Sequence, residues 1–185
     1  MKTIIISSDS WNIQEYFEFK KYFSEDTIFI NAYGITEVTI DSTYLDCSTL
    51  NIDNQGFVPI GDPFPNTQIY VLDQELNPTP IGVPGELCIG GEGVAIGYLN
   101  RPELTREKFV PNPFSDKVGE RIYRTGDLAR YLKDGTIEFL GRMDYQIKIR
   151  GLRVEIGEVE EVLMQHPLIK EAVVLAKKIN QEKIF

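Results

Sequence analysis

The chain has 185 residues, of which 42% are hydrophobic, and its aromatic side chains are 10 Phe, 9 Tyr and one Trp. This much apolar surface can build a packed core, so wholesale disorder is excluded. The formal charge of −9, from 28 acidic and 19 basic residues, disfavours a nucleic-acid or membrane partner, because both require a positive surface field.

Two features bear on the compartment. Cys47 and Cys88 are too few and too far apart for a disulfide framework or a zinc site, so we expect two reduced, packed thiols. The first residues contain only three consecutive Ile, far short of a signal-peptide core or a membrane span. A cytoplasmic location is therefore expected.

The N-terminal part has a strand, helix, strand pattern. An apolar run at 2–7 predicts a buried strand of the parallel type. Ser10 is predicted to cap a helix in which positions 13, 16, 17, 20 and 23 follow helical spacing. A second strand is predicted at 27–30. This order indicates the edge of an α/β sheet.

From Pro59 onward, short apolar runs alternate with turns rich in Gly, Pro, Asn and Asp, a pattern typical of a small barrel or sandwich. The runs lie at 68–72, 85–89, 122–123, 128–132 and 137–139. Residues 133–136, with the sequence KDGT, predict a hairpin in which Asp-Gly supplies the left-handed positions.

After Gly141 the pattern changes again. Two strands are predicted at 146–150 and 152–155, pinched at Gly151, followed by a helix at 157–165 that Pro167 ends, and residues 172–176 are predicted to return as a strand. We therefore expect a mixed α/β (α+β) chain in three parts. These are the end of an α/β subdomain (1–58), a β-rich barrel subdomain (59–142) and the start of a C-terminal α+β domain (143–185).

Four motifs resemble, in order and spacing, the core motifs of nonribosomal peptide synthetase adenylation domains, which belong to the adenylate-forming ligase superfamily. They are NAYGITE at 31–37, GELCIGGEGVAIGYLNRPELT at 85–105, YRTGDL at 123–128 and GRMDYQIKIRGLRVEIGEVE at 141–160. The resemblance implies that an amino acid and MgATP form an aminoacyl adenylate. The acyl group then passes to a phosphopantetheine thiol on a carrier domain. An acyl-CoA synthetase is a less favoured alternative, because the second and fourth motifs look like the peptide synthetase branch.

In the first motif the resemblance assigns nucleotide binding to Asn31, Ala32, Tyr33, Gly34 and Thr36. Tyr33 is the aromatic plane for adenine, with the backbone of the two preceding residues beside the base. Thr36 approaches the α-phosphate, and Glu37 holds Mg²⁺, for which a carboxylate oxygen is an appropriate ligand. Ile35 stands where the family usually has Pro. The alternative is an ordinary Tyr-Gly loop with a solvated Glu.

In the later motifs, Asp127 matches the family's ribose anchor, which accepts hydrogen bonds from the 2′ and 3′ hydroxyls. The alternative is a turn Asp after a Gly. Arg142 matches a ribose-contacting Arg and Asp144 the hinge of a C-terminal lid. Lys148 and Gly151 belong to the strand pair that the family swings toward the active site for thiol transfer.

The family's amino-acid pocket corresponds to Ile5, Ser7, Ala32, Ile40 and Asp41. Asp41 stands out, because a carboxylate in a closed pocket is costly unless a cation or donors meet it. A basic substrate such as Arg or ornithine would supply that cation. The alternative is that Asp41 caps the next turn with Ser42 and Thr43.

The glycine-rich part of the second motif has neither a P-loop ending nor dinucleotide-site spacing. In the family it is mostly scaffold, and Ile96 stands where Arg is common.

The resemblance also implies missing parts. The family's phosphate loop and its Asp for the substrate amino group would precede residue 1, and its catalytic Lys would follow Phe185. We therefore expect an adenylating ligase that is impaired alone. The alternative is a noncatalytic nucleotide-binding or interaction remnant, or a split subunit completed by another chain or by the remaining synthetase modules.

Overall fold

The computed structural model describes residues 2–7, 10–50, 56–143, 147–149 and 152–175. The chain divides into two compact units, Met1–Met143 and Asp144–Phe185, and each is described by itself. Within the described residues, no helix has both the length and the apolar character needed to cross a membrane.

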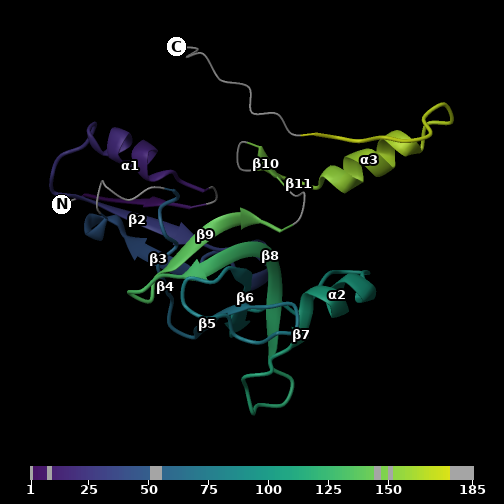
Figure 1. Cartoon of the computed structure of the whole chain (residues 1–185), viewed down its shortest axis with the longest axis horizontal. Coiled ribbons are helices and arrows are strands. Elements are labelled where there is room, and N and C mark those ends of the chain that lie inside the picture. The colour runs from purple at the N-terminus through teal and green to yellow at the C-terminus, as the bar shows by residue number, and fades with distance from the viewer. Residues whose placement is uncertain (1, 8–9, 51–55, 144–146, 150–151, 176–185) are drawn as a thin grey trace. The chain divides into compact units, whose positions relative to one another are not determined.

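One sheet of the first unit has four strands in sequence order. They are β1 (Lys2–Ile6), β2 (Thr27–Tyr33), β3 (Thr43–Asp46) and β4 (Asp62–Pro63). β1 is parallel to β2 and the other neighbours are antiparallel. Parallel neighbours need a crossover, and α1 (Ile13–Lys20) supplies it (Figure 1). The predicted strand, helix, strand order is therefore confirmed.

The helix α1 begins at a different cap from the predicted one. Asn12, not Ser10, is the N-cap: its side chain accepts a hydrogen bond from the Gln14 amide at 2.8 Å, and Glu15 reaches back to the Asn12 amide. This reciprocal capping box satisfies two amides at once, which explains why the helix begins at Ile13. It ends at Lys20, before the predicted position 23.

The core under α1 consists of buried side chains from the helix, from β2 and β3, and from residues that follow β3: Ile13, Tyr16, Phe29, Leu45, Cys47 and Val58. Cys47 is 1% exposed and Cys88, in the second sheet, is 0% exposed. Both are free thiols, so the expectation that they are packing residues is confirmed.

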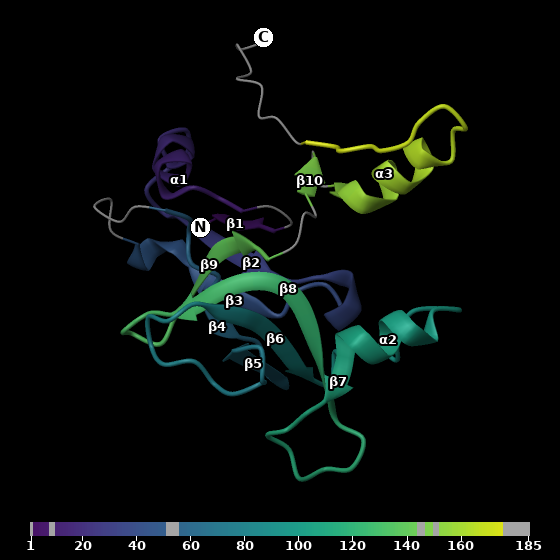
Figure 2. The same ribbon diagram turned by 45° about the vertical axis from the view of Figure 1, so that its right-hand side comes forward.

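The second sheet of this unit has five antiparallel strands. They are β5 (Thr67–Leu72), β6 (Gly85–Gly91), β7 (Phe109–Pro111), β8 (Arg121–Tyr131) and β9 (Ile137–Arg142). The order is β5-β6-β8-β7, and β9 also pairs with β8. β8 is long and curved (Figures 1 and 2). It carries β6 on one edge, while β7 and β9 share the other.

The mixed α/β class is confirmed, but the predicted barrel is not. Among the described residues the five-stranded sheet stays open, because its edge strand β5 pairs only with β6 and not with β7 or β9. The runs predicted separately at 122–123 and 128–132 form the single strand β8, since Thr125 and Asp127 in the interval are buried and Asp127 pairs with Arg142 of β9. α2 (Pro102–Lys108) precedes β7.

The β8–β9 hairpin forms as predicted, with one change at its turn. Gly135 has φ = 90°, whereas Asp134 is not left-handed. Asp134 instead accepts a hydrogen bond from the Thr136 amide at 3.0 Å, and the Gly135 amide donates to Leu132 O at 3.0 Å. A three-residue turn with one glycine therefore closes the hairpin.

The second unit contains β10 (Ile147–Ile149) and β11 (Leu152–Val154), which are antiparallel, and α3 (Ile156–Met164). These agree with the sequence. The described residues 172–175 form no strand, because their backbone pairs with no neighbouring strand. The strand predicted at 172–176 is therefore wrong within these residues. There the Val174 amide donates to Glu160 Oε1 at 2.8 Å instead.

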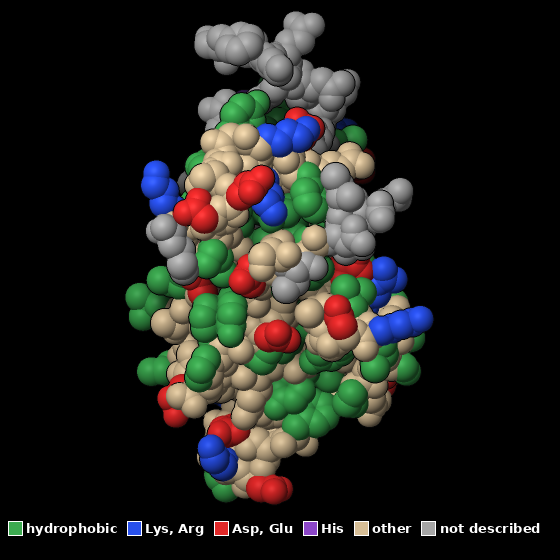
Figure 3. All heavy atoms as spheres, turned by 90° about the vertical axis from the view of Figure 1, so that its left-hand side faces the viewer, with side chains coloured by type: hydrophobic (Ala, Val, Ile, Leu, Met, Phe, Trp, Pro, Cys, Tyr) green, Lys and Arg blue, Asp and Glu red, His purple; other side chains and the backbone are tan. Residues whose placement is uncertain are grey.

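On the face drawn in Figure 3, acidic and basic side chains of the described residues are interspersed among hydrophobic ones, without a continuous basic patch. This face accordingly lacks the positive surface that a nucleic acid would require.

Candidate nucleotide-binding site

Three of the predicted nucleotide-binding residues meet at one carboxylate. Asp127 lies in the middle of β8, Arg142 is its register partner at the end of β9, and Tyr33 ends β2. The Tyr33 hydroxyl donates to Asp127 Oδ2, and Arg142 Nη1 donates to Asp127 Oδ1 at 2.9 Å. The side chain of Asp127 is 5% exposed. The fold thus assembles residues from both sheets into one charged cluster.

The buried negative charge of Asp127 is paired with the positive charge of Arg142. Hydrogen bonds to a charged group contribute about 1.5–3 kcal/mol each where water is excluded. Burial, followed by the charge of Asp127, raises the pKa of Tyr33 well above its ordinary value, so this hydroxyl remains a donor at neutral pH. A carboxylate has two oxygens with about two acceptor positions each, so one carboxylate can accept several donors at once.

The loop after Tyr33 folds tightly back on itself. A Cβ on Gly34 would lie 1.5 Å from Ile40 O, so no other residue fits there. Thr39 and Ile40 both have positive φ, 65° and 70°, which is unusual for β-branched residues. The Ser42 amide donates to Tyr33 O at 2.7 Å and closes the loop.

Ile35, where the family usually has Pro, has φ = −141°. Proline is limited to about −65°, so this departure from the family pattern accompanies a different backbone conformation. The 3₁₀ helix η1 (Thr36–Val38) follows directly, and the Ile40 amide donates back to Ile35 O at 3.2 Å. Thr36 is exposed at the start of this turn.

Glu37 is 8% exposed, so it is not the solvated Glu of the alternative interpretation. Its Oε1 accepts a hydrogen bond from the Tyr98 hydroxyl at 2.7 Å, and that hydroxyl lies 2.9 Å from the Tyr123 hydroxyl. Burial, together with the hydrogen bonds to Tyr123 and Glu37, raises the pKa of Tyr98. The Glu37 carboxylate is therefore held in one orientation.

Glu37 fits a magnesium ion that is shared with a nucleotide. Within the described part of the chain, no three His, Cys, Asp or Glu side chains form a metal-binding group. Mg²⁺ typically binds one or two carboxylates and takes its other ligands from substrate phosphates and water. A single buried and oriented carboxylate provides that kind of site.

The glycine-rich segment supports this loop, in line with its expected scaffold role. The Ala95 amide donates to Glu37 O at 2.9 Å, and Thr39 Oγ1 donates to Gly93 O at 2.8 Å. A Cβ on Gly93 would lie 2.7 Å from Val38 O. The segment therefore needs small residues here because it packs against backbone.

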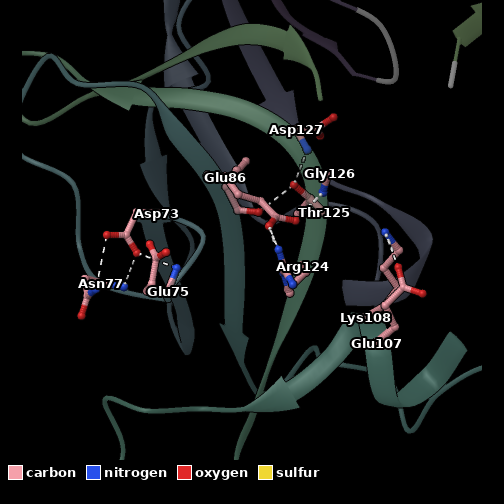
Figure 4. Close-up of polar contacts among 11 residues, drawn as sticks. Asp73, Glu75, Asn77, Glu86, Glu107, Lys108, Arg124, Thr125, Gly126 and Asp127 are labelled. Carbon is pink, nitrogen blue, oxygen red and sulfur yellow. Dashed lines mark hydrogen bonds and ion pairs between the residues drawn. The ribbon is translucent and has the colours of Figure 1, made fainter. Parts of the chain in front are cut away.

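A second buried carboxylate lies beside Asp127, and the sequence analysis did not identify it as part of the site. Glu86 Oε2 accepts hydrogen bonds from Arg124 Nε and Nη2 at 2.9 and 2.6 Å, and Glu86 Oε1 accepts one from the Gly126 amide at 3.1 Å (Figure 4). Glu86 is 6% exposed. The signal that could have indicated it is a carboxylate within an otherwise apolar strand, which requires a partner.

The remaining predicted residues are placed as follows. Asn31 is buried, and its Nδ2 donates to Pro59 O at 2.9 Å. Ala32 is buried and is the register partner of Tyr44. Asp144 and Gly151 lie outside the described residues, and Lys148 is described only as a residue of β10.

Among the predicted pocket residues, the fold brings Ser7 and Asp41 together. Ser7 Oγ donates to Asp41 Oδ1 at 3.0 Å. Ile5 and Ile40 are 66% and 70% exposed. The Ser42 amide donates to the Tyr33 carbonyl.

A family model described as AMP-binding enzyme matches residues 2–99. The chain therefore belongs to the AMP-binding enzyme family.

Similar proteins narrow the likeness to nonribosomal peptide synthetases. Gramicidin S synthase 2 of Brevibacillus brevis is 50% identical over 185 residues, which is all of this chain but 4% of that protein. An artificially fused adenylation–PCP di-domain NRPS from Klebsiella oxytoca, NpsA-ThdA, has a TM-score of 0.79 at 29% identity, covering 96% of this chain and 32% of its own. PA1221, an NRPS protein containing adenylation and PCP domains, has a TM-score of 0.85 at 27% identity over 97% of this chain and 36% of its own. The resemblance in the sequence is confirmed, and the chain spans only a fraction of these relatives.

Proposed function

We propose that this chain is the nucleotide-binding portion of an amino-acid adenylation domain in nonribosomal peptide synthesis. The proposal rests mainly on the cluster in which Tyr33 and Arg142 both donate to the buried Asp127. In the reaction, the amino-acid carboxylate attacks the α-phosphorus of ATP, pyrophosphate leaves, and the aminoacyl group then passes to a phosphopantetheine thiol. The proposed location is the cytoplasm, where two unpaired thiols stay reduced.

Each residue of the cluster has a distinct role in this proposal. Asp127 accepts the ribose 2′ and 3′ hydroxyls, with Arg142 beside it as countercharge and ribose contact. Tyr33 presents its ring to adenine while its hydroxyl holds Asp127. The burial of Asp127 supports these roles, because charge-assisted hydrogen bonds are strongest where water is excluded.

The loop that follows Tyr33 is proposed to contact the phosphates of ATP. Exposed Thr36 lies near the α-phosphate, and buried Glu37 binds Mg²⁺, which offsets the negative charge of the ATP phosphates. The backbone of Asn31 and Ala32 lies beside the base, and Gly34 lets the loop fold closely enough. The Tyr98 hydrogen bond that orients Glu37 supports this assignment.

The chain is assigned three parts of the whole domain. Residues 1–58 are the end of the α/β subdomain with the adenine loop, 59–142 the β-rich subdomain, and 143–185 the beginning of the lid, with Asp144 as hinge. A carrier domain and the remaining synthetase modules are the partners. The similarity to structures whose titles name adenylation and PCP domains supports this assignment.

The test is AMP binding measured by calorimetry. We expect Asp127→Ala to weaken binding about tenfold or more, which corresponds to about 1.4 kcal/mol per decade. Asp134→Ala, which removes an exposed carboxylate from the same β8–β9 hairpin, is the matched control and should leave the affinity unchanged. Equal affinity for wild type and Asp127→Ala would remove Asp127 from the site.

The amino-acid substrate is proposed to be basic. The hydrogen bond from Ser7 supports a pocket role for Asp41, and a guanidinium or ammonium group would neutralise its charge. In an adenylation domain that joins this chain to the family's phosphate loop, substrate Asp and catalytic Lys, amino-acid-dependent pyrophosphate exchange should favour Arg or ornithine, and Asp41→Ala should abolish that preference. Preference for an apolar substrate that Asp41→Ala does not change would end this proposal.

A second candidate function is a noncatalytic or split subunit that binds nucleotide and is completed by another chain. The chain spans 4% of Gramicidin S synthase 2 and 32% of the NpsA-ThdA chain. Exchange activity that appears only after mixing with a polypeptide carrying the remaining adenylation segments would support the split form.

A further inference from the structure

Residues 125–127 form an irregular stretch within β8, which we call the turn at 125–127. This turn is held by hydrogen bonds on two sides. On one side, Glu86 Oε1 accepts a hydrogen bond from the Gly126 amide, and Glu86 Oε2 accepts two from the Arg124 guanidinium. On the other, Thr125 Oγ1 accepts the Asp127 amide at 2.9 Å and donates to Leu87 O at 2.7 Å. Figure 4 shows Glu86 and Arg124 beside the backbone of Thr125, Gly126 and Asp127.

The turn needs this support because its backbone is unusual for a strand. Gly126 has φ = 73°, a left-handed conformation in the interior of β8. The register between β6 and β8 also shifts between Glu86 and Cys88. Such an irregularity re-aims the side chain that follows it, and the residue that follows is Asp127.

The same turn also holds the end of β9. The Gly126 carbonyl accepts the Met143 amide at 2.8 Å, and the Asp127 carboxylate accepts Arg142. The orientation of the Gly126 peptide therefore affects both the direction of Asp127 and its distance to Arg142.

We propose that Glu86, paired with Arg124, is a positioning residue for ribose recognition by Asp127. This role rests on the proposed nucleotide-binding function. Glu86 makes no contact with the nucleotide in this proposal. Its buried carboxylate fixes the Gly126 peptide, and thereby aims Asp127 at a pair of neighbouring hydroxyl groups. The effect is specificity for ligands that carry both hydroxyls.

Glu86→Gln tests the proposal with little change in shape. The carboxamide has one acceptor oxygen and one NH₂ group, so it can satisfy the Gly126 amide or the Arg124 guanidinium but not both. The matched control is Glu138→Gln. Glu138 forms a 2.6 Å pair with Arg130 in the same sheet, away from the turn at 125–127.

The readout is the ratio of the affinities for AMP and 2′,3′-dideoxy-AMP, measured by calorimetry. Wild type and Glu138→Gln should both prefer AMP by about tenfold or more, because only AMP can use Asp127. In Glu86→Gln the preference should fall to within about threefold of unity, while dideoxy-AMP binds as in wild type. A general loss of structure would instead weaken both ligands together.

A second measurement does not depend on the nucleotide. Amide hydrogen exchange at Gly126 and Asp127 should accelerate in Glu86→Gln relative to other β8 amides, and remain unchanged in Glu138→Gln. If Glu86→Gln fails to fold, Arg124→Lys replaces it, because a single ammonium group cannot reproduce the two bonds to Oε2.

The outcomes separate the two proposals. A wild type that binds no AMP, or does not discriminate against the dideoxy form, overturns the nucleotide site and this role with it. A wild type that discriminates, with full discrimination kept in Glu86→Gln or Arg124→Lys, overturns only the positioning role.

Discussion

At the residue scale, the candidate site differs from the exposed surface because its carboxylates are buried and hydrogen-bonded to specific side chains. Asp127, Glu86 and Glu37 are all buried, and each accepts hydrogen bonds from side chains on other segments. Exposed pairs such as Lys21–Glu18 contribute little, because water and salt screen them. Charge changes at the buried groups should therefore have the larger effects.

The buried thiols make stability depend on pH. Burial raises the pKa of Cys47 to about 11 and that of Cys88 to about 12, from an ordinary value of 9.0. A raised folded-state pKa means that this stabilisation is complete below about pH 9 and is lost as pH rises through 11–12. We expect the urea concentration at the unfolding midpoint to decrease as the pH is raised from 8 to roughly 10.5.

The double variant Cys47→Ala, Cys88→Ala is the control for that decline. It should start from a lower midpoint, because two small cavities remain, but lose less stability with rising pH. A decline as steep as in wild type would assign the pH dependence to other groups, among them Tyr16, whose pKa burial raises to about 12.

At the element scale, the helix α1 illustrates how a local cap decides a boundary. The Asn12 and Glu15 capping box is reciprocal, and Tyr16 in the same helix anchors it to the core through a 3.1 Å hydrogen bond to Cys47 O. The crossover between β1 and β2 depends on this helix.

We expect Asn12→Ala to lower the free energy of unfolding by about 1 kcal/mol, because one helix amide loses its acceptor. Asn12→Ser keeps an acceptor oxygen and should retain most of the stability. Urea unfolding followed by circular dichroism measures both. Identical losses in the two variants would indicate that the cap contributes nothing.

The loop from Gly34 to Asp41 is the second element whose local geometry matters. Gly34→Ala should destabilise the chain by at least about 2 kcal/mol, since its Cβ would overlap the Ile40 carbonyl. AMP binding should weaken with it, because Tyr33 and Glu37 flank this position.

Gly157→Ala provides the comparison for that loop. A Cβ at Gly157, in α3, meets nothing within 4 Å, and alanine favours helix over glycine by up to about 1 kcal/mol. Thermal unfolding of both variants is the measurement. A Gly34→Ala variant as stable as wild type would contradict the close approach of the loop.

At the scale of the whole molecule, β8 is the central strand of the second sheet and is linked to β2 of the first sheet by the hydrogen bond between Tyr33 and Asp127. It contacts β6, β7 and β9 and carries Asp127 near its middle. The chain nevertheless covers about a third of the solved adenylation–PCP chains, so binding and catalysis need not be retained together.

The isolated chain should show no amino-acid-dependent pyrophosphate exchange while still binding AMP. The family's phosphate loop, substrate Asp and catalytic Lys have no counterparts in the motifs of this sequence. Their loss would remove several kcal/mol of transition-state stabilisation. Robust exchange with any amino acid would refute this expectation and require a substitute lysine, for which Lys148 in β10 is the first candidate.

The sequence by itself determined the family and most of the elements. Four ordered motifs identified it, apolar runs predicted β1, β6 and β9, and helical spacing predicted α1 and α3, each near its observed position. It also singled out Tyr33, Asp127 and Arg142, which the fold brings together. Local patterns failed where tertiary partners decide: the strand at 172–176, the separate runs within β8 and the closed barrel.

Only the tertiary structure revealed that Glu86, Arg124 and Tyr98 support the candidate site. These residues hold Gly126 and Glu37 across sequence separations of 38 to 61 residues. Hydrogen bonds between distant segments leave no periodic pattern, because each depends on where the fold places a single donor and a single acceptor.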